Sequence, residues 1–282
     1  HNHFIIQPND LKNNFYSILD SMDSPTIDGV NTFFVSKFTK EKGISVAMSG
    51  LGGDEFFGGY SSFKDYGVLK NLKSQLKFIP KEILRILNNF NFNDKLNKFS
   101  EFLLSENDSV LQPYLSLKSL MHDKVLNKLF IPEYENFFKD YLIDEINNIK
   151  FYSNENLVSF FESKIYMGNQ LLRDSDTMSM AHTLELRVPF LDHTLVNHIN
   201  TIPGSFKKNK IMLIDSMKDF MPEEVYKRPK KGFLFPFEEW IRKDLLTEVK
   251  DLFFVENEIF NKKVLQETWK NFENKKTNWA RI

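Results

Sequence analysis

The stretch Ser49-Gly-Leu-Gly-Gly-Asp-Glu-Phe-Phe-Gly-Gly-Tyr60, called the glycine loop below, carries more structural information than any other part of this chain. It directly follows Ile44–Met48, an apolar run that predicts a short buried strand. The glycines therefore fall where a strand gives way to a helix. Glycine at such a turn lets backbone N–H groups approach an anion closely, and the helix N-terminus adds partial positive charge. This pattern is typical of phosphate binding.

The same glycines have a purely structural interpretation. They fit a tight strand-to-helix turn with Asp54 as the helix N-cap and Gly58 or Gly59 as the C-cap. Taken alone, the glycines favour neither interpretation.

The composition limits the classes of function. With 282 residues, of which 41% are hydrophobic, the chain can bury a full core as one large or two small domains. A net charge of −1 gives no reason to expect nucleic acid, and the absence of cysteine excludes disulfides, thiolate metal sites and a cysteine nucleophile within this chain. No apolar run is long enough to span a bilayer, so we expect a cytoplasmic protein without a membrane partner. The histidines show no metal-ligand spacing.

The first sixty residues differ from the rest. They predict the order β-α-α-β, with elements at His3–Gln7, Asn9–Asp20, Val30–Glu41 and Ile44–Met48. We interpret residues 1–60 as part of a parallel α/β nucleotide-binding layer that includes the glycine loop. Residues 61–282 carry amphipathic helical patterns with a break at Pro80. The predicted fold is mostly α with a partial parallel α/β layer at the N-terminus, and both parts form one continuous domain.

A long apolar stripe over Glu155–Ala181 predicts a central buried helix. Three charged residues, Arg173, Asp174 and Asp176, lie at its far end. Charges that close to a core either pair with one another or contact a ligand, and the sequence leaves both open.

Two further charged segments follow. Glu185 and Arg187 form a fixing salt bridge or line a site, and Asp192 is placed as a helix N-cap. Lys230 and Lys231 stand in a loop between two predicted helices, where lysines are either solvated or able to reach a phosphate.

The glycine loop resembles the second signature of the asparagine synthetase family, Ser-Gly-x-Gly-x-Asp-Glu-x-Phe-x-Gly-Tyr. Four more blocks resemble that family in the same order, at Asp23–Asn31, Leu171–Ala181, Glu185–Asp192 and Lys227–Phe233. Five blocks in family order make chance agreement improbable, although each alone is only a hypothesis. The chain is therefore similar to the C-terminal synthetase domain of the glutamine-hydrolysing type.

The resemblance implies a fragment of an adenine-nucleotide α-hydrolase-like (PP-loop) synthetase domain. Such enzymes use ATP and Mg²⁺ to adenylate a carboxylate, which ammonia from a glutaminase domain then attacks. By position, the implied catalytic residues are Lys230, Asp54 and Glu55, and Asp54 is also the implied Mg²⁺ ligand. The implied nucleotide-binding residues are Ser49, Gly50, Gly52, Tyr60, Arg173, Asp174 and Asp176. The implied partners are a small carboxylate and ammonia, with a homodimer possible.

The sequence departs from the family pattern in three ways. It contains neither the glutaminase domain nor its cysteine, and the Ser-Gly-Gly-x-Asp-Ser loop that normally precedes this region is absent. We therefore expect a fragment, truncated at both ends and inactive alone. In asparagine-forming members an acidic residue stands where this chain has Leu51, so the resemblance implies a product other than asparagine.

Two other functions are compatible with the residues. The chain could be a catalytically degenerate scaffold or binding module of the same fold, or a tRNA-modifying relative. Asp54, Glu55 and Lys230 together favour the ligase, because a scaffold has no need of all three. Neutral charge and the lack of an aromatic-basic surface argue against the tRNA enzyme.

Overall fold

The computed structural model of the protein describes residues 3–26, 28–89, 94–105, 110–121, 123–131, 146, 153–228, 232 and 235–282. The chain forms two compact units, the first of His1–Phe63 with Tyr152–Leu245 and the second of Lys64–Phe151 with Leu246–Ile282. Within the described ranges, no helix has both the length and the apolar character needed to cross a bilayer.

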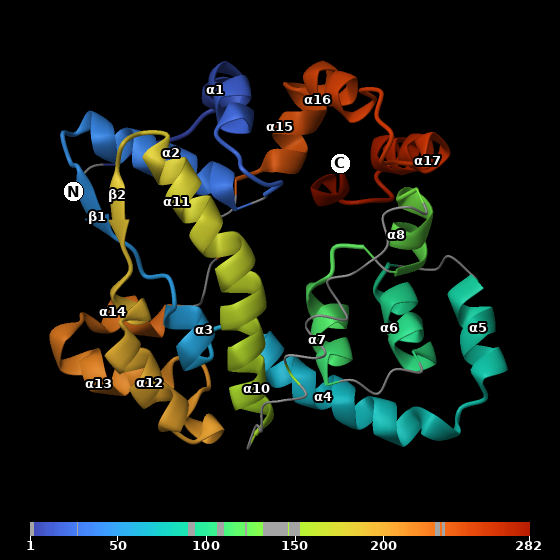
Figure 1. The fold of residues 1–282 in the computed structure, drawn as a ribbon, viewed down its shortest axis with the longest axis horizontal. Coiled ribbons are helices and arrows are strands. Elements are labelled where there is room, and N and C mark those ends of the chain that lie inside the picture. Colours follow the sequence, from blue (N-terminus) through green and yellow to red (C-terminus); the bar gives the residue numbers. More distant parts are fainter. Residues whose placement is uncertain are drawn as a thin grey trace. The chain divides into compact units, whose positions relative to one another are not determined.

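The first unit contains both strands and the glycine loop (Figure 1). Its α-helices and strands are α1 (Pro8–Asp20), α2 (Gly29–Glu41), β1 (Val46–Met48), α3 (Gly53–Phe57), α10 (Asn154–Phe161), α11 (Leu172–Met180), β2 (Glu185–Arg187), α12 (His193–Thr201), α13 (Ile211–Met217), α14 (Glu223–Lys227) and α15 (Phe237–Lys243). Its π- and 3₁₀-helices are η2 (Glu162–Leu171), η3 (Pro189–Leu191), η4 (Gly204–Phe206) and η5 (Lys218–Phe220).

Among the residues described for it, the second unit consists of helices joined by irregular segments, with one isolated antiparallel bridge between Phe130 and Phe260. Its elements are α4 (Ser62–Gln75, which begins in the first unit), η1 (Leu76–Phe78), α5 (Lys81–Asn89), α6 (Asp94–Leu104), α7 (Leu111–Lys118), α8 (Asp123–Leu129), α16 (Leu246–Phe253), α17 (Lys262–Glu273) and η6 (Trp279–Arg281). The predicted break at Pro80 is confirmed, because it falls between η1 and α5. A mostly helical chain with a small parallel sheet is therefore confirmed.

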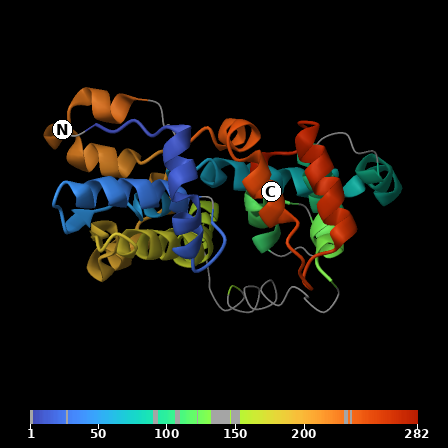
Figure 2. The same ribbon diagram turned by 90° about the horizontal axis from the view of Figure 1, so that it is seen from above.

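The core of the first unit forms where α2 packs along α11. Both views show these helices side by side (Figures 1 and 2). Phe33, Phe34 and Met178 are buried there. Gly29 packs tightly there, because a Cβ at that position would lie 2.6 Å from Thr26 Cγ2 and 3.0 Å from Met178 Cε. The structure also confirms the helices predicted at Asn9–Asp20 and Val30–Glu41, which are α1 and α2.

The sheet consists of two parallel strands, with Val46 opposite Glu185 and Met48 opposite Arg187. The predicted strand before the glycine loop is thus confirmed, but its predicted burial is wrong, since Met48 is 81% exposed. The physical reason is that Val46 and Met48 lie on one face of the strand and that face is left exposed, whereas α11 packs against β2. The strand predicted at His3–Gln7 is also wrong. Those residues are irregular, because no strand partners them among the described residues, and α1 begins at Pro8, a residue suited to the first helical position.

The predicted central helix over Glu155–Ala181 is confirmed as one rod from α10 through η2 to α11 (Figure 1). Ser153 caps its start by accepting a hydrogen bond from the Asn156 N–H, with a donor–acceptor distance of 3.1 Å. The middle of the rod, η2, is a π-helix of ten residues. Against it packs α3, whose Phe56 and Phe57 join Met167 in a buried cluster. The central rod therefore packs against α3, which is the helical part of the glycine loop.

Candidate functional site

The glycine loop turns from β1 into α3 by way of a left-handed residue. Gly52 has φ +94° and is the N-cap of α3, so the predicted N-cap role of Asp54 is wrong. Asp54 lies instead in the first turn, because only glycine adopts the required backbone angle without strain. Gly58 is the C-cap of α3 and is left-handed, at φ +73°, so of the two predicted C-cap positions, Gly58 and Gly59, the structure selects Gly58.

The loop glycines differ in what surrounds them. A Cβ on Gly50 would meet nothing within 4 Å, so the space beside this residue is open. A Cβ on Gly52 would lie 2.9 Å from Leu191 and 3.0 Å from Phe190. Packing and backbone conformation therefore explain why position 52 is glycine, whereas the open side of Gly50, next to the half-buried Ser49, leaves room for a ligand.

Glu55 is buried, with 1% of its surface exposed, and both carboxylate oxygens are engaged. Oε2 accepts the Gly52 N–H at 3.0 Å, and Oε1 accepts the Tyr60 hydroxyl at 2.7 Å. The Ser159 hydroxyl donates to the Glu55 carbonyl oxygen at 2.9 Å. Burial raises the pKa of Glu55. Glu55 and Tyr60 therefore hold the two ends of the loop together through these hydrogen bonds. We call this pair the Tyr60–Glu55 brace.

Asp54 faces the other way and forms an ion pair with Lys210. Its Oδ1 lies 2.8 Å from the Lys210 ammonium, with 25% of the Asp54 and 35% of the Lys210 side chain exposed. Gly59 makes this arrangement possible, because a Cβ there would lie 1.7 Å from Asp54 Oδ1 and 2.7 Å from Lys210 Cε. The pair therefore places a carboxylate and a cation together at the rim of the glycine loop.

Backbone hydrogen bonds fasten the segment that carries Lys210 to the end of α3. The Asn209 N–H donates to Gly58 O at 2.9 Å, and the Lys210 N–H donates to Phe57 O at 3.0 Å. Asn209 and Lys210 both adopt positive φ, at 51° and 57°, which is uncommon outside glycine. No sequence motif marks this segment as part of a site. Three lysines in Lys207–Lys210 are the only signal, and such runs are ordinarily solvated.

Lys207 is the buried member of this segment, with 1% of its surface exposed. Burial lowers the pKa of its ammonium to about 8. Its neighbour Lys208 reaches Glu155 at the start of α10, with the ammonium 3.5 Å from Oε1. The segment is thus held between α3 and α10.

The charged residues at the end of the central rod contact the segment before α2. Arg173 forms an ion pair with Asp23 at 2.9 Å. Asp174 is 3% exposed and accepts a hydrogen bond from the Thr26 hydroxyl. Asp176 is exposed and lies apart from both contacts. Arg173 and Asp174 are therefore engaged with the segment before α2, and the described contacts do not pair them with one another.

Burial, together with the nearby carboxylates of Asp28 and Asp23, raises the pKa of Asp174 from its ordinary 3.8 to about 6. Above about pH 6 the charged carboxylate then destabilises the fold by up to about 3 kcal/mol, and this penalty disappears as the pH falls toward 4. Asp174→Asn keeps an acceptor for Thr26 and removes the charge. We expect it to raise the free energy of unfolding at pH 7.5 and to have a much smaller effect near pH 4.

Urea denaturation at several pH values measures this effect. Asp176→Asn, an exposed site on the same helix, is the matched control and should show no such dependence. An equal change for Asp174→Asn at every pH would contradict the burial argument.

Three other predicted features have different outcomes. Glu185 and Arg187 form an exposed salt bridge at 2.9 Å, and Asp192 is confirmed as an N-cap that accepts from the Thr194 and Leu195 N–H groups. The proposed catalytic Lys230 and its neighbour Lys231 lie outside the described residues.

A pre-formed metal cage is absent from the described part of the chain, where no group of three acidic or histidine side chains could hold a metal ion. Asp54 nevertheless offers a partly exposed carboxylate. Mg²⁺ commonly takes only one or two protein carboxylates and completes its shell with phosphate oxygens and water. The residues therefore fit Mg²⁺ delivered with a nucleotide.

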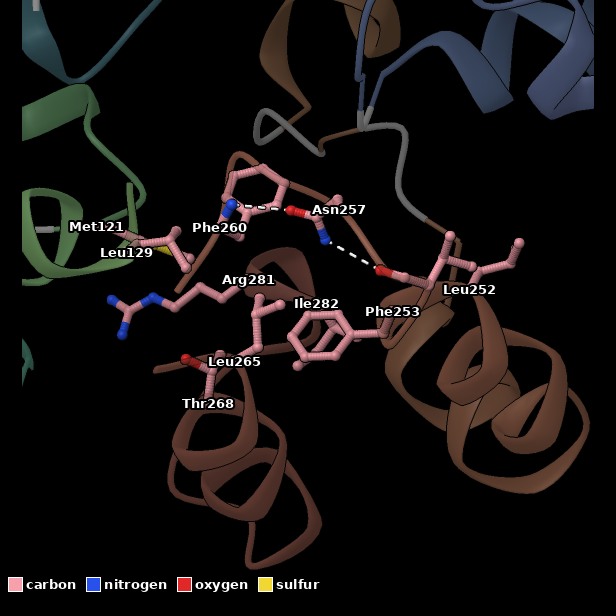
Figure 3. A pocket seen from close by; sticks show the side chains of 11 residues that line it. Met121, Leu129, Leu252, Phe253, Asn257, Phe260, Leu265, Thr268, Arg281 and Ile282 are labelled. Atoms are coloured by element: carbon pink, nitrogen blue, oxygen red, sulfur yellow. Dashed lines mark hydrogen bonds between the residues drawn. The ribbon is translucent and has the colours of Figure 1, made fainter. Parts of the chain in front are cut away.

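The second unit contains a cavity of about 350 Å³ (Figure 3). Its walls are largely apolar, and its polar Asn257 bonds the Val255 carbonyl and the Phe260 N–H within one turn. None of the described residues predicted to bind the nucleotide lines it.

The asparagine synthase family model matches residues 1–282. The chain is 28% identical over 256 residues to the asparagine synthetase [glutamine-hydrolyzing] 1 of Bacillus subtilis, covering 88% of this chain and 40% of that protein. It is 22% identical to amidase chry2 of Gibberella zeae, over 81% of this chain and 37% of that protein. A putative asparagine synthetase of Mycobacterium bovis is 25% identical over 80% of this chain and 35% of its own length. The chain thus spans about 40% or less of these relatives.

Proposed function

The chain belongs to the asparagine synthase family, and on that premise we propose that it is the synthetase part of an ATP-dependent, amide-forming ligase. In the proposed reaction a carboxylate oxygen of the substrate attacks the α-phosphorus of ATP, and the bond to the β-phosphate oxygen breaks to release pyrophosphate. Ammonia then attacks the acyl carbon of the adenylate. The amide forms, AMP leaves, and one proton is released.

The observation that carries this proposal is the Asp54–Lys210 ion pair at the rim of an open glycine loop. Adenylation brings an anion against a triphosphate, so the transition state requires positive charge fixed beforehand. Lys210 supplies such a charge, and Lys230 is the second cation that the family pattern implies. Asp54 would hold Mg²⁺, which when bound neutralises the leaving pyrophosphate. Ser49 and Gly50 would contact the nucleotide, and Arg173 and Asp174 would shape the same pocket indirectly.

The exposed sheet supports the proposal that the full-length protein completes this site. Parallel strands are normally covered on both faces, yet Val46 and Met48 are 45% and 81% exposed. We propose that further strands of the full-length protein extend this sheet at its edges and that their crossover helices cover the exposed face. The pyrophosphate-binding loop that the family carries would lie on one of these strands, beside Gly50.

Leu51 bears on the substrate. It lies half-buried in the loop, with its N–H 3.4 Å from the Ser49 hydroxyl oxygen. A leucine cannot take a proton from an incoming amine, and a positioned acid or base contributes about 10² to 10⁴ in rate to such a step. We propose that Leu51 lines an apolar side of the acceptor pocket and that the substrate is a carboxylate other than aspartate.

The test gives the full-length protein ATP, Mg²⁺, ammonia and a panel of carboxylic acids that includes aspartate. Pyrophosphate exchange and mass spectrometry of the products are measured. We expect exchange with an acid other than aspartate and no asparagine. Asparagine formed at several turnovers per second would overturn the interpretation of Leu51. A folded protein without exchange for any acid would favour the inactive scaffold.

A further inference from the structure

A line of side-chain contacts joins the glycine loop to the start of α2. At one end, Glu55 receives the Gly52 N–H and the Tyr60 hydroxyl. The ring of Tyr60 meets the ring of Tyr166 edge to face, with centroids 5.9 Å apart and an interplanar angle of 75°. At the other end, the Tyr166 hydroxyl donates to Asp28 Oδ2 at 2.8 Å. The segment before α2 and the glycine loop are thereby connected through one tyrosine, which lies 138 residues after Asp28.

Tyr166 occupies an unusual place in the backbone. It lies within the π-helix η2, the part of the central rod against which α3 packs. Four residues earlier in the same π-helix, the buried Glu162 accepts a hydrogen bond from Ser62, the residue that begins α4. π-helical turns are rare and are frequently found at functional sites. This stretch therefore contacts the end of the glycine loop twice, at Tyr60 through Tyr166 and at Ser62 through Glu162.

The chemistry of the two tyrosines points to a fixed geometry and not to proton transfer. Burial and the facing carboxylates raise the pKa of both phenols, with Asp28 acting on Tyr166 and Glu55 acting on Tyr60. Both hydroxyls thus stay protonated at neutral pH and remain hydrogen-bond donors. A donor that cannot ionise serves to hold its acceptor in place.

We propose that Tyr166 is a positioning residue for the ligase reaction, fixing the Tyr60–Glu55 brace so that Asp54 and the loop backbone meet the nucleotide phosphates in one orientation. This inference rests on the proposed function. Neither the family motifs nor the apolar stripe of the central helix singles out Tyr166. A misplacement of about 1 Å at a reacting group typically costs up to about 10²-fold in rate.

The principal variant is Tyr166→Phe in the full-length protein, which keeps the ring and removes the hydroxyl. We expect kcat for pyrophosphate exchange to fall by about 10- to 10²-fold while KM for ATP changes little. The matched control is Tyr66→Phe. Tyr66 is fully buried and donates to the Val110 carbonyl at 2.7 Å in the second unit, so it loses a comparable hydrogen bond away from the glycine loop. We expect its exchange rate to stay parental.

Two Asp28 variants separate positioning from a general loss of stability. Asp28→Asn retains an oxygen that can accept from Tyr166 and should keep most of the parental exchange rate. Asp28→Ala removes this acceptor and should lower the exchange rate as much as Tyr166→Phe does. Combining Asp28→Ala with Tyr166→Phe should cost little more than either change alone, because both remove the same bond. Additive losses, a parental rate for Tyr166→Phe, or equal losses for Tyr166→Phe and Tyr66→Phe would each overturn the proposal.

Hydrogen exchange at the amides of Gly52 and Gly59 provides a readout that does not depend on activity. Tyr166→Phe should speed their exchange by about tenfold, as loss of one buried hydrogen bond allows, and Tyr66→Phe should not. If the full-length protein shows no pyrophosphate exchange with any acid, the proposed function fails. The hydrogen-exchange rates of these two amides then still test whether Tyr166 positions the loop. Unchanged amide exchange would overturn the proposal in that case.

Discussion

Asp54→Asn is expected to slow adenylate formation in the full-length protein by about 10²-fold or more, because it removes the charge that holds Lys210 and would hold Mg²⁺. Lys230→Ala is expected to have an effect of similar size. The asparagine side chain has almost the same shape as aspartate, so the fold should survive. Pyrophosphate exchange measures the rate, and circular dichroism with thermal unfolding measures the fold.

Asp215→Asn is the matched control for this change. Asp215 also pairs with a lysine, Lys218 at 3.7 Å, but its side chain is 64% exposed and it lies on α13. Its loss should leave exchange unchanged. If Asp54→Asn kept near-parental exchange in a folded protein, Asp54 would have to be reassigned to a structural role.

Gly58→Ala is expected to destabilise the first unit by about 3 kcal/mol or more, because steric overlap and backbone strain both contribute. A Cβ at this position would lie 2.2 Å from the Lys207 carbonyl oxygen and 2.5 Å from its carbon, which are backbone atoms that cannot rotate away. The left-handed backbone, at φ +73°, adds a strain of about 1–2 kcal/mol for a residue with a side chain. The backbone hydrogen bonds from Asn209 and Lys210 to the end of α3 also hold Lys210 beside Asp54. Because a Cβ on Gly58 would displace this segment, the variant should also lose pyrophosphate exchange activity.

Gly43→Ala separates the two contributions to that loss. Gly43 has φ +77°, but a Cβ there would meet nothing within 4 Å, so only the backbone strain applies. We expect Gly43→Ala to cost about 1–2 kcal/mol in urea denaturation and to leave exchange unchanged. Equal destabilisation by the two variants would mean that the close approach of Lys207 to Gly58 does not constrain the fold.

Local sequence patterns predicted the elements that they encode directly. The apolar spacing gave α1, α2 and the central rod, and Gly58 marked the end of α3, because these features depend on neighbouring residues. The burial of β1 and the strand at His3–Gln7 were wrong for one reason. A strand is formed and covered by partners elsewhere in the chain, and its own sequence does not show whether they are present.

The candidate site was predictable only in part. The glycine loop and its carboxylates form a recognisable motif, so Asp54 and Glu55 could be located from the sequence. The different contacts of the two carboxylates could not be predicted. The structure turns Glu55 inward to Tyr60 and Asp54 outward to Lys210. Lys210 and Tyr166 reach the loop from more than a hundred residues away, and their contacts depend on tertiary packing that no local pattern encodes.

The central claim is that the full-length protein activates a carboxylate as an adenylate. The most direct measurement uses the best acid of the panel, labelled with ¹⁸O in its carboxylate, together with ATP, Mg²⁺ and ammonia. The account predicts that one labelled oxygen appears in the phosphate of AMP while pyrophosphate stays unlabelled. Label in inorganic phosphate with release of ADP would show an acyl phosphate instead and would contradict the account.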